Sequence, residues 1–409
     1  MEFLPYVYLT YMFISLYMLI LFLMLYIRNK EDFFSYPHSK KNYSVSFIVP
    51  AYNEEKTIED TLKHIFDIDY DNIKEVIVVN DCSKDNTAKI VRSLLKKYKK
   101  LKLLDNKKNL GKAGGLNRAL KIAKGDLVAV VDADSYPSSD SLKKMVGFFD
   151  EENVGAVTCQ ILSRRKDKFF EKLQAIEYQV IAFTRKLLDF VDAIWCTPGP
   201  LALYRKKALE DINGFDEGSM TEDIEATWHL ASRGWHRRMC LDTSVSSTVP
   251  QTIKPWFKQR RRWNVGGLQS IYKYRKSIGR EGMLGAFIIP FFIIGLFLGL
   301  IGLSIFFYLL IRNTMSKYLL TLYSIETNTP IITIETLYIT PSFLNYLGVI
   351  LFLLGLVFTL IMLSILNEKI LKKENILTIP FYMIVYLTVY PFIMLAAIWH
   401  AYRGKRIWR

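Results

Sequence analysis

The sequence predicts an α/β domain with a mostly parallel, Rossmann-like sheet, joined to an α-helical transmembrane region. Short strands rich in Val and Ile alternate with helical segments between residues 44 and 250, and long apolar runs lie on either side of that region. Such alternation is typical of parallel sheets that are covered on both faces. With 409 residues, the chain has room for more than one domain.

The order of elements follows from the local pattern. Each expected strand is a short apolar run, and each expected helix repeats its apolar residues at three- to four-residue spacing. We expect strands at 45–49, 75–79, 101–104 and 127–131, and helices at 55–66, 85–98 and 113–123.

Polar residues follow three of these strands directly. Residues 50–54 read Pro-Ala-Tyr-Asn-Glu, residues 80–83 read Asn-Asp-Cys-Ser, and residues 132–135 read Asp-Ala-Asp-Ser. Ligands of such sheets bind beyond the carboxyl ends of the strands. Loops are usually polar, so a chance cluster is the alternative, but three successive strand ends favour a ligand site.

Four long runs carry no charged residue: Phe3–Ile27, Leu284–Ile311, Phe343–Leu366 and Ile376–Trp399. A helix needs roughly 20 residues to cross the hydrocarbon core, and buried globular helices rarely stay apolar all round for so long. The first run lacks a basic leader and a cleavage site, which favours a retained anchor over a signal peptide.

The expected organisation is therefore a transmembrane helix at 1–27, a cytoplasmic domain at 28–253, an amphipathic interfacial segment at 254–283, and a transmembrane region of about three spans at 284–409.

Basic residues near the ends of the runs predict the orientation. Arg28, Lys30 and Lys41 follow the first run, whereas Glu2 is the only charge before it. This places residues 28–283 in the cytoplasm of a multi-pass protein of the cell (plasma) membrane. The basic tail from Arg403 onward conflicts with four full spans: either the last run is re-entrant around Pro391, or the rule fails here.

The formal net charge of +15 does not indicate nucleic-acid binding, because the basic residues flank the apolar runs and crowd 254–280. Anionic headgroups and a diphosphate ligand are the expected partners there. The four cysteines show no C-x-x-C spacing and are expected to be reduced thiols.

Three segments carry chemistry. Asp132 and Asp134 stand one residue apart after a strand, where carboxylates suit Mg²⁺. Glu222 and Asp223 open a helix, where acids also simply stabilise the first turn. The third segment, Gln259 to Trp263, reads Gln-Arg-Arg-Arg-Trp; it suits a basic helix on the bilayer, and equally suits arginine binding to phosphate beside an aromatic platform for a sugar.

Taken together, these motifs resemble the processive family 2 glycosyltransferases, such as the hyaluronan and poly-N-acetylglucosamine synthases. The resemblance covers residues 44 to 270. It rests on Val-Pro-Ala-Tyr-Asn-Glu, Asn-Asp-Cys-Ser, Gly-Lys-Ala-Gly-Gly-Leu-Asn, Asp-Ala-Asp, Thr-Glu-Asp and Gln-x-x-Arg-Trp in the family order. Cys82 replaces a usual glycine, and Gly115 stands where alanine is common.

The resemblance implies a GT-A fold and a role for each motif residue. Asp223 would be the general base, Asp134 would bind Mg²⁺ or Mn²⁺, and Glu222, Gln259 and Trp263 would frame or gate the acceptor. The donor would be bound by Ala51, Tyr52, Glu54, Asp81, Lys112, Asp132 and Arg262.

The expected function is that of a metal-dependent hexosyltransferase. It would transfer a sugar, N-acetylglucosamine in the leading interpretation, from a UDP-sugar to a growing polysaccharide with inversion. Coupled translocation across the bilayer and an accessory export subunit are further expectations. A non-processive transferase with a lipid acceptor and a non-catalytic export subunit are the alternatives.

Overall fold

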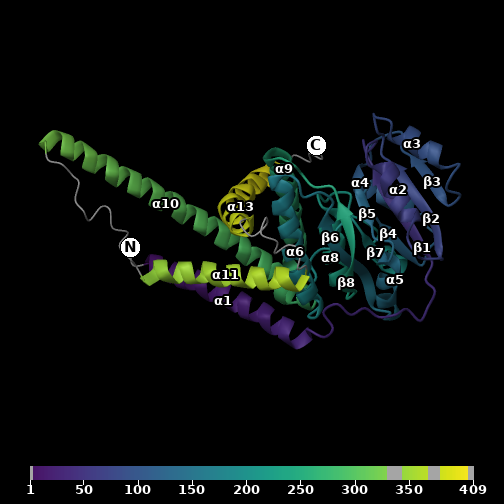
Figure 1. Cartoon of the computed structure of the whole chain (residues 1–409), viewed down its shortest axis with the longest axis horizontal. Helices are drawn as coiled ribbons and strands as arrows, with labels where there is room; N and C mark the ends of the chain where they lie inside the picture. Colours follow the sequence, from purple (N-terminus) through teal and green to yellow (C-terminus); the bar gives the residue numbers. More distant parts are fainter. Residues whose placement is uncertain (1–2, 329–342, 367–377, 404–409) are drawn as a thin grey trace.

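The structure is a computed structural model that describes residues 3–328, 343–366 and 378–403. An α/β domain lies at one end of the molecule, and long helices extend away from it (Figure 1). Four of these helices are long and apolar enough to cross a membrane, so the chain is a membrane protein.

The domain is built on an eight-stranded sheet in the order β3-β2-β1-β4-β7-β6-β8-β5. Strands β1, β2, β3 and β4 pair in parallel, as do β6 and β8, whereas β7 runs antiparallel to β4 and β6, and β5 to β8. The strands are β1 (Val45–Ala51), β2 (Ile73–Asn80), β3 (Leu101–Asp105), β4 (Leu127–Val130), β5 (Ser135–Pro137), β6 (Val154–Ser163), β7 (Ala202–Arg205) and β8 (His236–Ser247). The predicted parallel half is confirmed.

Helices cover both faces of the sheet, as expected. On one face α2 (Ile58–Phe66), α3 (Thr87–Leu94) and α5 (Ser141–Met145) enclose a core with the 3-10 turn η1 (Val146–Asp150). On the other face α4 (Gly111–Leu120), α7 (Lys206–Asp211) and α8 (Glu222–Ser232) enclose a second core.

Two helices begin later than the spacing predicts, because local polar contacts hold the chain in loops. The Glu55 backbone N–H donates to the Asp85 carboxylate at 3.1 Å, and α2 starts at Ile58. Asp85 accepts hydrogen bonds from the Thr87 backbone N–H (3.0 Å) and hydroxyl (2.5 Å), so α3 starts after it.

Two further helices connect the domain to the apolar region. They are α6 (Phe169–Asp189) and α9 (Ile253–Tyr274), and α9 is followed by short turns at Arg275–Ser277 and Leu284–Ile288. The apolar helices are α1 (Phe3–Asn29), α10 (Ile289–Thr327), α11 (Phe343–Leu366) and α13 (Thr378–Tyr402). In Figure 1, α1, α10 and α11 extend away from the sheet, and α13 lies close to α9.

Helix α13 packs against these connecting helices at both of its ends. Ile379, near its start, packs in a cluster with Ile176 of α6, and Ala397, near its end, packs with Met220 and Val265. The helix runs without interruption through Pro391. The last apolar run is therefore one continuous helix rather than a segment broken at the proline.

Candidate active site

The acidic residues predicted from separate motifs line one cavity of about 780 Å³. Asp132 and Asp134 enter it from the end of β4, and Glu222 and Asp223 enter it from the first turn of α8. This volume is typical of small-molecule sites. The structure therefore brings together residues that are about 90 positions apart in the chain.

Lys112 joins these two sets of carboxylates. Its Nζ lies 2.6 Å from Asp132 Oδ1 and 2.6 Å from Glu222 Oε1. Burial lowers the pKa of Lys112, but the charges of Asp132 and Glu222 outweigh that effect and raise it. Lys112 stays protonated and fastens the end of β4 to the start of α8.

Gly199 makes room for this ion pair. A Cβ at position 199 would lie 2.7 Å from Lys112 Nζ and 2.8 Å from Asp132 Oδ2. The Asp132 backbone N–H donates to the Gly199 carbonyl at 3.1 Å. A larger residue at position 199 would therefore displace the ends of the Lys112 and Asp132 side chains from this ion pair.

Asp134 is half-buried, and its pKa is raised to about 7 by partial burial and by the negative charges of Asp132 and Glu54. Its carboxylate accepts a hydrogen bond from the Ser135 hydroxyl at 3.3 Å. Such a carboxylate gains from a nearby cation. No cluster of three or more His, Cys, Asp or Glu suited to a metal occurs among the described residues, so a cation here needs ligand oxygens from a substrate, the arrangement Mg²⁺ favours.

Glu222 is buried and Asp223 is half-buried, and their pKa values move in opposite directions. Burial and the charge of Glu222 raise the pKa of Asp223. Burial also disfavours ionised Glu222, but the charges of Lys112 and Arg262 outweigh it and lower the pKa of Glu222. A carboxyl with a raised pKa is suited to accept a proton, which favours Asp223 over Glu222 as a base.

The Asp223 carboxyl is held in place on both sides. Its Oδ1 accepts from the Ile224 backbone N–H at 2.9 Å, and the Cys196 thiol lies 3.7 Å from Oδ2. Burial raises the pKa of Cys196 well above its usual value, so this thiol is a neutral neighbour rather than a nucleophile.

Helix α9 brings the Gln-x-x-Arg-Trp segment to the same cavity, which Gln259, Arg262 and Trp263 all line. The helix approaches α8 closely at Gly266, where a Cβ would lie 1.8 Å from the Thr221 hydroxyl oxygen. A glycine at this crossing lets α9 approach the start of α8 closely enough for both to face one site.

A buried ion pair anchors α9 to α6 and α13. Arg260 is fully buried and pairs with Glu177, and it also donates to the Tyr386 hydroxyl at 3.0 Å. Its guanidinium lies 4.1 Å from the ring centroid of Trp256. The sequence motifs did not indicate Glu177, because its partner is 83 residues away.

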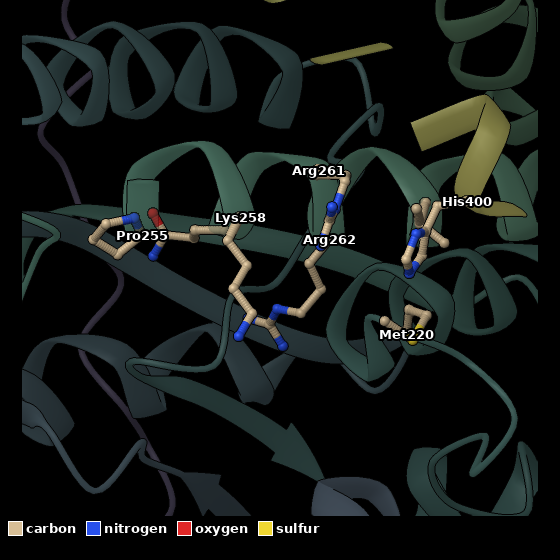
Figure 2. A pocket seen from close by; sticks show the side chains of 8 residues that line it. Met220, Pro255, Lys258, Arg261, Arg262 and His400 are labelled. Carbon is tan, nitrogen blue, oxygen red and sulfur yellow. The ribbon is translucent and has the colours of Figure 1, made fainter. Parts of the chain in front are cut away.

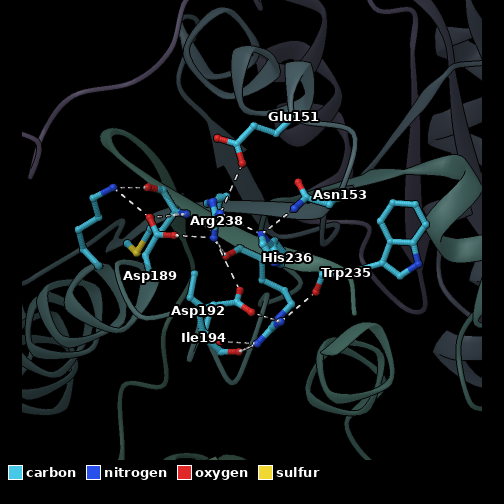
Figure 3. A network of polar contacts seen from close by, with 11 residues as sticks. Glu151, Asn153, Asp189, Asp192, Ile194, Trp235, His236 and Arg238 are labelled. Atoms are coloured by element: carbon cyan, nitrogen blue, oxygen red, sulfur yellow. Dashed lines mark hydrogen bonds and ion pairs between the residues drawn. The ribbon is translucent and has the colours of Figure 1, made fainter. Parts of the chain in front are cut away.

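One stripe of α6 faces the cavity, at positions 177, 178, 181, 184, 185 and 188. A network of polar contacts fixes the far end of α6 to β8 (Figure 3). Asp189 pairs with Lys186 at 3.0 Å and accepts from the Met239 backbone N–H at 3.2 Å, and Arg238 lies 3.7 Å from Asp192. These contacts determine which residues of α6 turn toward the cavity.

A smaller pocket of about 260 Å³ lies along α9 and shares Gln259 and Arg262 with the large cavity. Lys258 and Arg261 make its wall basic, and His400 closes it from α13 (Figure 2).

Four predicted donor-binding residues do not line the described cavity: Ala51, Tyr52, Glu54 and Asp81. Asp81 accepts backbone N–H groups of Leu110 at 2.8 Å and Gly111 at 2.9 Å, so in this structure it fixes the start of α4. Glu54 is closer to the acids, because its charge contributes to the raised pKa of Asp134.

Cys82 has a φ of 62°, in the left-handed region that favours glycine. The position thus has the backbone conformation of the glycine that the resemblance implied. A Cβ on Gly115 would lie 3.2 Å from Val79, so an alanine there needs a small adjustment.

Part of the α/β domain matches a known protein family. Residues 46–213 match the family described as glycosyl transferase family 2. These residues are a family 2 glycosyltransferase domain. Glu222, Asp223 and the whole of α9 lie beyond this matched range, so their place in the site rests on the structure.

The glycosyltransferase domain has named relatives. The chain is 34% identical over 225 residues to a poly-β-1,6-N-acetyl-D-glucosamine synthase of Staphylococcus aureus, which is 54% of each chain. It is 33% identical over 249 residues to the synthase of that name from Staphylococcus epidermidis, which is 60% of each chain. The matched region spans somewhat more than half the length of these curated relatives.

A solved structure shares the fold over nearly the whole chain. It is a mannosyltransferase of Pyrobaculum calidifontis in complex with GDP-mannose and Mn²⁺, with a TM-score of 0.58 and 20% identity. The match covers 94% of this chain and 96% of that one. The GT-A fold joined to apolar helices is therefore confirmed for this chain.

Proposed function

We propose that this protein transfers a sugar, N-acetylglucosamine or a close relative, from a UDP-sugar to the end of a growing polysaccharide, with inversion. One observation carries the proposal: Asp134 and Asp223 face the same cavity, together with Lys112, Arg262 and Trp263. The names of the staphylococcal relatives support the choice of sugar and of product.

In this proposal Asp223 accepts the proton of the acceptor hydroxyl while that oxygen attacks the anomeric carbon and the bond to the diphosphate breaks. A positioned base contributes roughly 10²–10⁴-fold. Lys112 and Arg262 face the departing diphosphate as fixed cations, and Trp263 offers an aromatic face to the acceptor sugar. Ala51, Tyr52, Glu54 and Asp81 remain proposed contacts of the uridine.

Asp134 is the proposed residue that holds a divalent cation, with Asp132 beside it. The raised pKa of Asp134 fits this role, because its carboxylate is surrounded by negative charge that a cation would balance. When bound, Mg²⁺ or Mn²⁺ neutralises charge that develops on the diphosphate.

The cavity also continues toward the membrane helices. Tyr382, Tyr386 and Tyr390 of α13 line it, with Gly295 and Gly299 of α10. This continuity supports a route by which a growing chain enters the apolar region. We further propose a plasma-membrane location with the catalytic domain in the cytoplasm, and an accessory export subunit as an additional partner.

A second candidate is a non-processive transferase with a lipid acceptor. The apolar wall that Phe22, Phe291, Phe292 and Leu296 contribute to the cavity favours it. Product analysis separates the two, because a lipid adduct of one sugar stays in the organic phase and a polymer does not.

The test uses the full-length protein purified in detergent. It is incubated with a panel of UDP-sugars and Mg²⁺ or Mn²⁺, and UDP release and the size of radiolabelled product are measured. We expect release that depends on the divalent cation and on one UDP-sugar, with product longer than a single sugar. Absence of release with every donor, or cation-independent release, would contradict the proposal.

A further inference from the structure

Arg185 of α6 is a buried cation without a partner. It is 4% exposed, lines the large cavity, and makes no hydrogen bond or ion pair with the residues that the structure describes. Its Nε is buried without a hydrogen-bond acceptor. An unpaired buried ion costs several kcal/mol in a real protein, so this arrangement requires an explanation.

The other charged residues of α6 that line the cavity or follow Arg185 are paired. Glu177 pairs with Arg260, and Lys186 pairs with Asp189 at 3.0 Å. Arg185 lies between Glu177 and Lys186 in the sequence, and its side chain lines the cavity. The missing partner is therefore specific to this position rather than general to the helix.

Among the residues that the structure describes, no anion forms an ion pair with Arg185. The titratable groups whose charge acts on Arg185 include Cys196, Cys159, Asp223 and Tyr178. Burial raises the pKa of both thiols, so they are neutral, and burial also raises the pKa of Tyr178. Asp223 is the only carboxylate of the four, and it forms no ion pair with Arg185 among the described contacts.

Arg185 shares the cavity with two other cations, and apolar residues line the wall with it. Lys112 and Arg262 already provide cations at the proposed diphosphate end. On its own helix, Arg185 has Ile181 and Leu188 as cavity-lining neighbours, and Trp195 and Phe22 also line the wall. A guanidinium in an apolar wall suits an oxyanion, which it binds with two parallel hydrogen bonds.

We propose that Arg185 binds a phosphate or carboxylate group carried by the acceptor, and so selects anionic acceptors. This rests on the proposed glycosyl transfer, and it gives the acceptor an anionic group that a chain of N-acetylglucosamine alone does not carry. The oxyanion has two sources, a lipid-linked phosphate or an acidic saccharide. In both, Arg185 acts as a binding residue and takes no part in proton transfer.

The experiment compares Arg185→Gln with Lys172→Gln, which removes a positive charge from the same helix at a position outside the cavity. Three acceptor probes are used with full-length protein: a neutral N-acetylglucosamine tetramer, a uronate-containing tetramer, and a polyprenyl phosphate. UDP affinity and acceptor affinity are measured by calorimetry, and transfer by product analysis.

We expect wild-type protein to bind at least one anionic probe at least tenfold more tightly than the neutral tetramer. Arg185→Gln should lose that preference, Arg185→Lys should restore part of it, and Lys172→Gln should keep it. UDP affinity should stay within twofold in all variants. Comparison of the wild-type affinities for polyprenyl phosphate and for the uronate-containing tetramer identifies the source of the oxyanion.

Equal affinity of wild type for neutral and anionic probes would overturn the proposal, as would an anionic preference that survives Arg185→Gln. Failure of wild type to bind UDP would instead contradict the proposed function. The proposal would also be overturned if Arg185→Gln lowered the melting temperature but left the acceptor preference unchanged. That result would show that Arg185 has a structural role.

Discussion

The carboxyls of Glu222 and Asp223 are adjacent in the chain, but the fold places them in different electrostatic environments. Lys112 contacts Glu222 at 2.6 Å, whereas the Asp223 carboxyl faces a neutral thiol. This asymmetry lowers the pKa of Glu222 and raises that of Asp223, which suits the proposed role of Asp223 as the proton acceptor.

Asp223→Asn is expected to reduce transfer by roughly 10²–10⁴-fold, since it removes the positioned base. UDP affinity should change little, because Lys112 and Asp132 are left in place. Turnover and UDP binding of the purified variant are the measurements. A variant that keeps more than a tenth of wild-type turnover would show that another group accepts the proton.

The pH dependence of turnover tests the raised pKa of Asp223. A base acts when deprotonated, so turnover should fall on acidification at a pH above the ordinary range of an Asp carboxyl. Glu222→Gln removes the charge that raises this pKa, and it should move the acidic limb of kcat/KM to lower pH. If the acidic limb of kcat/KM stays at the same pH in Glu222→Gln, the assignment of Asp223 as the base is contradicted.

The crossing of α8 and α9 gives a paired test of close packing. Gly266→Ala puts a methyl group where the Thr221 hydroxyl lies, and we expect a loss of about 1–3 kcal/mol of stability together with reduced turnover. Gly267→Ala is the control, because no atom lies within 4 Å of a Cβ there. Melting temperatures of the two variants should move apart, with Gly267→Ala equal to wild type or higher.

The elements α6, α9 and α13 depend on the buried pair of Glu177 and Arg260. Glu177→Gln leaves the Arg260 charge uncompensated, and breaking such a pair costs about 3–5 kcal/mol. The double variant Glu177→Leu with Arg260→Met should recover part of this loss. Asp69→Asn breaks a pair that is over two thirds exposed, and its melting temperature should equal that of wild type.

The sequence predicted the parallel half of the sheet because β1, β2 and β4 are short apolar runs that end in polar turns. It did not predict the antiparallel β7, because β-strand pairing between distant segments leaves no local pattern. The same reason explains which site residues could be predicted. Asp134, Asp223 and Trp263 belong to local motifs, whereas Glu177 and Arg185 lie in a helix whose apolar spacing gives no sign of their place in the cavity.

The placement of α13 bears on the orientation of the whole molecule. Its start contacts α6 and its end contacts α9 and Met220, all of which adjoin the α/β domain. We therefore propose that three helices cross the bilayer and that Arg403 lies on the catalytic side. This would remove the conflict between the basic tail and four full spans. Of the basic tail used to predict the orientation, residues 404–409 lie outside the described residues.

Cysteine labelling in sealed vesicles tests this arrangement, in protein with Cys82 replaced by Ser. Tyr402→Cys should react with an impermeant maleimide from the same side as Lys99→Cys in the catalytic domain, and Tyr6→Cys from the other side. All three positions are exposed. Reaction of Tyr402→Cys together with Tyr6→Cys would mean that α13 crosses the bilayer.

The length of helix α10 indicates how far the large cavity lies from the hydrocarbon core of the membrane. Its 39 residues would reach about 58 Å at 1.5 Å per residue, close to twice the hydrocarbon thickness. Suppose that Arg312, the first charged residue of α10, lies at the far boundary of the hydrocarbon core. The near boundary then lies about 20 residues earlier in the helix, at Phe292, which lines the large cavity. The part of the large cavity that Phe292 lines would then lie at the near edge of the hydrocarbon core. A newly extended polysaccharide would therefore enter the hydrocarbon core directly from the cavity, without first crossing water.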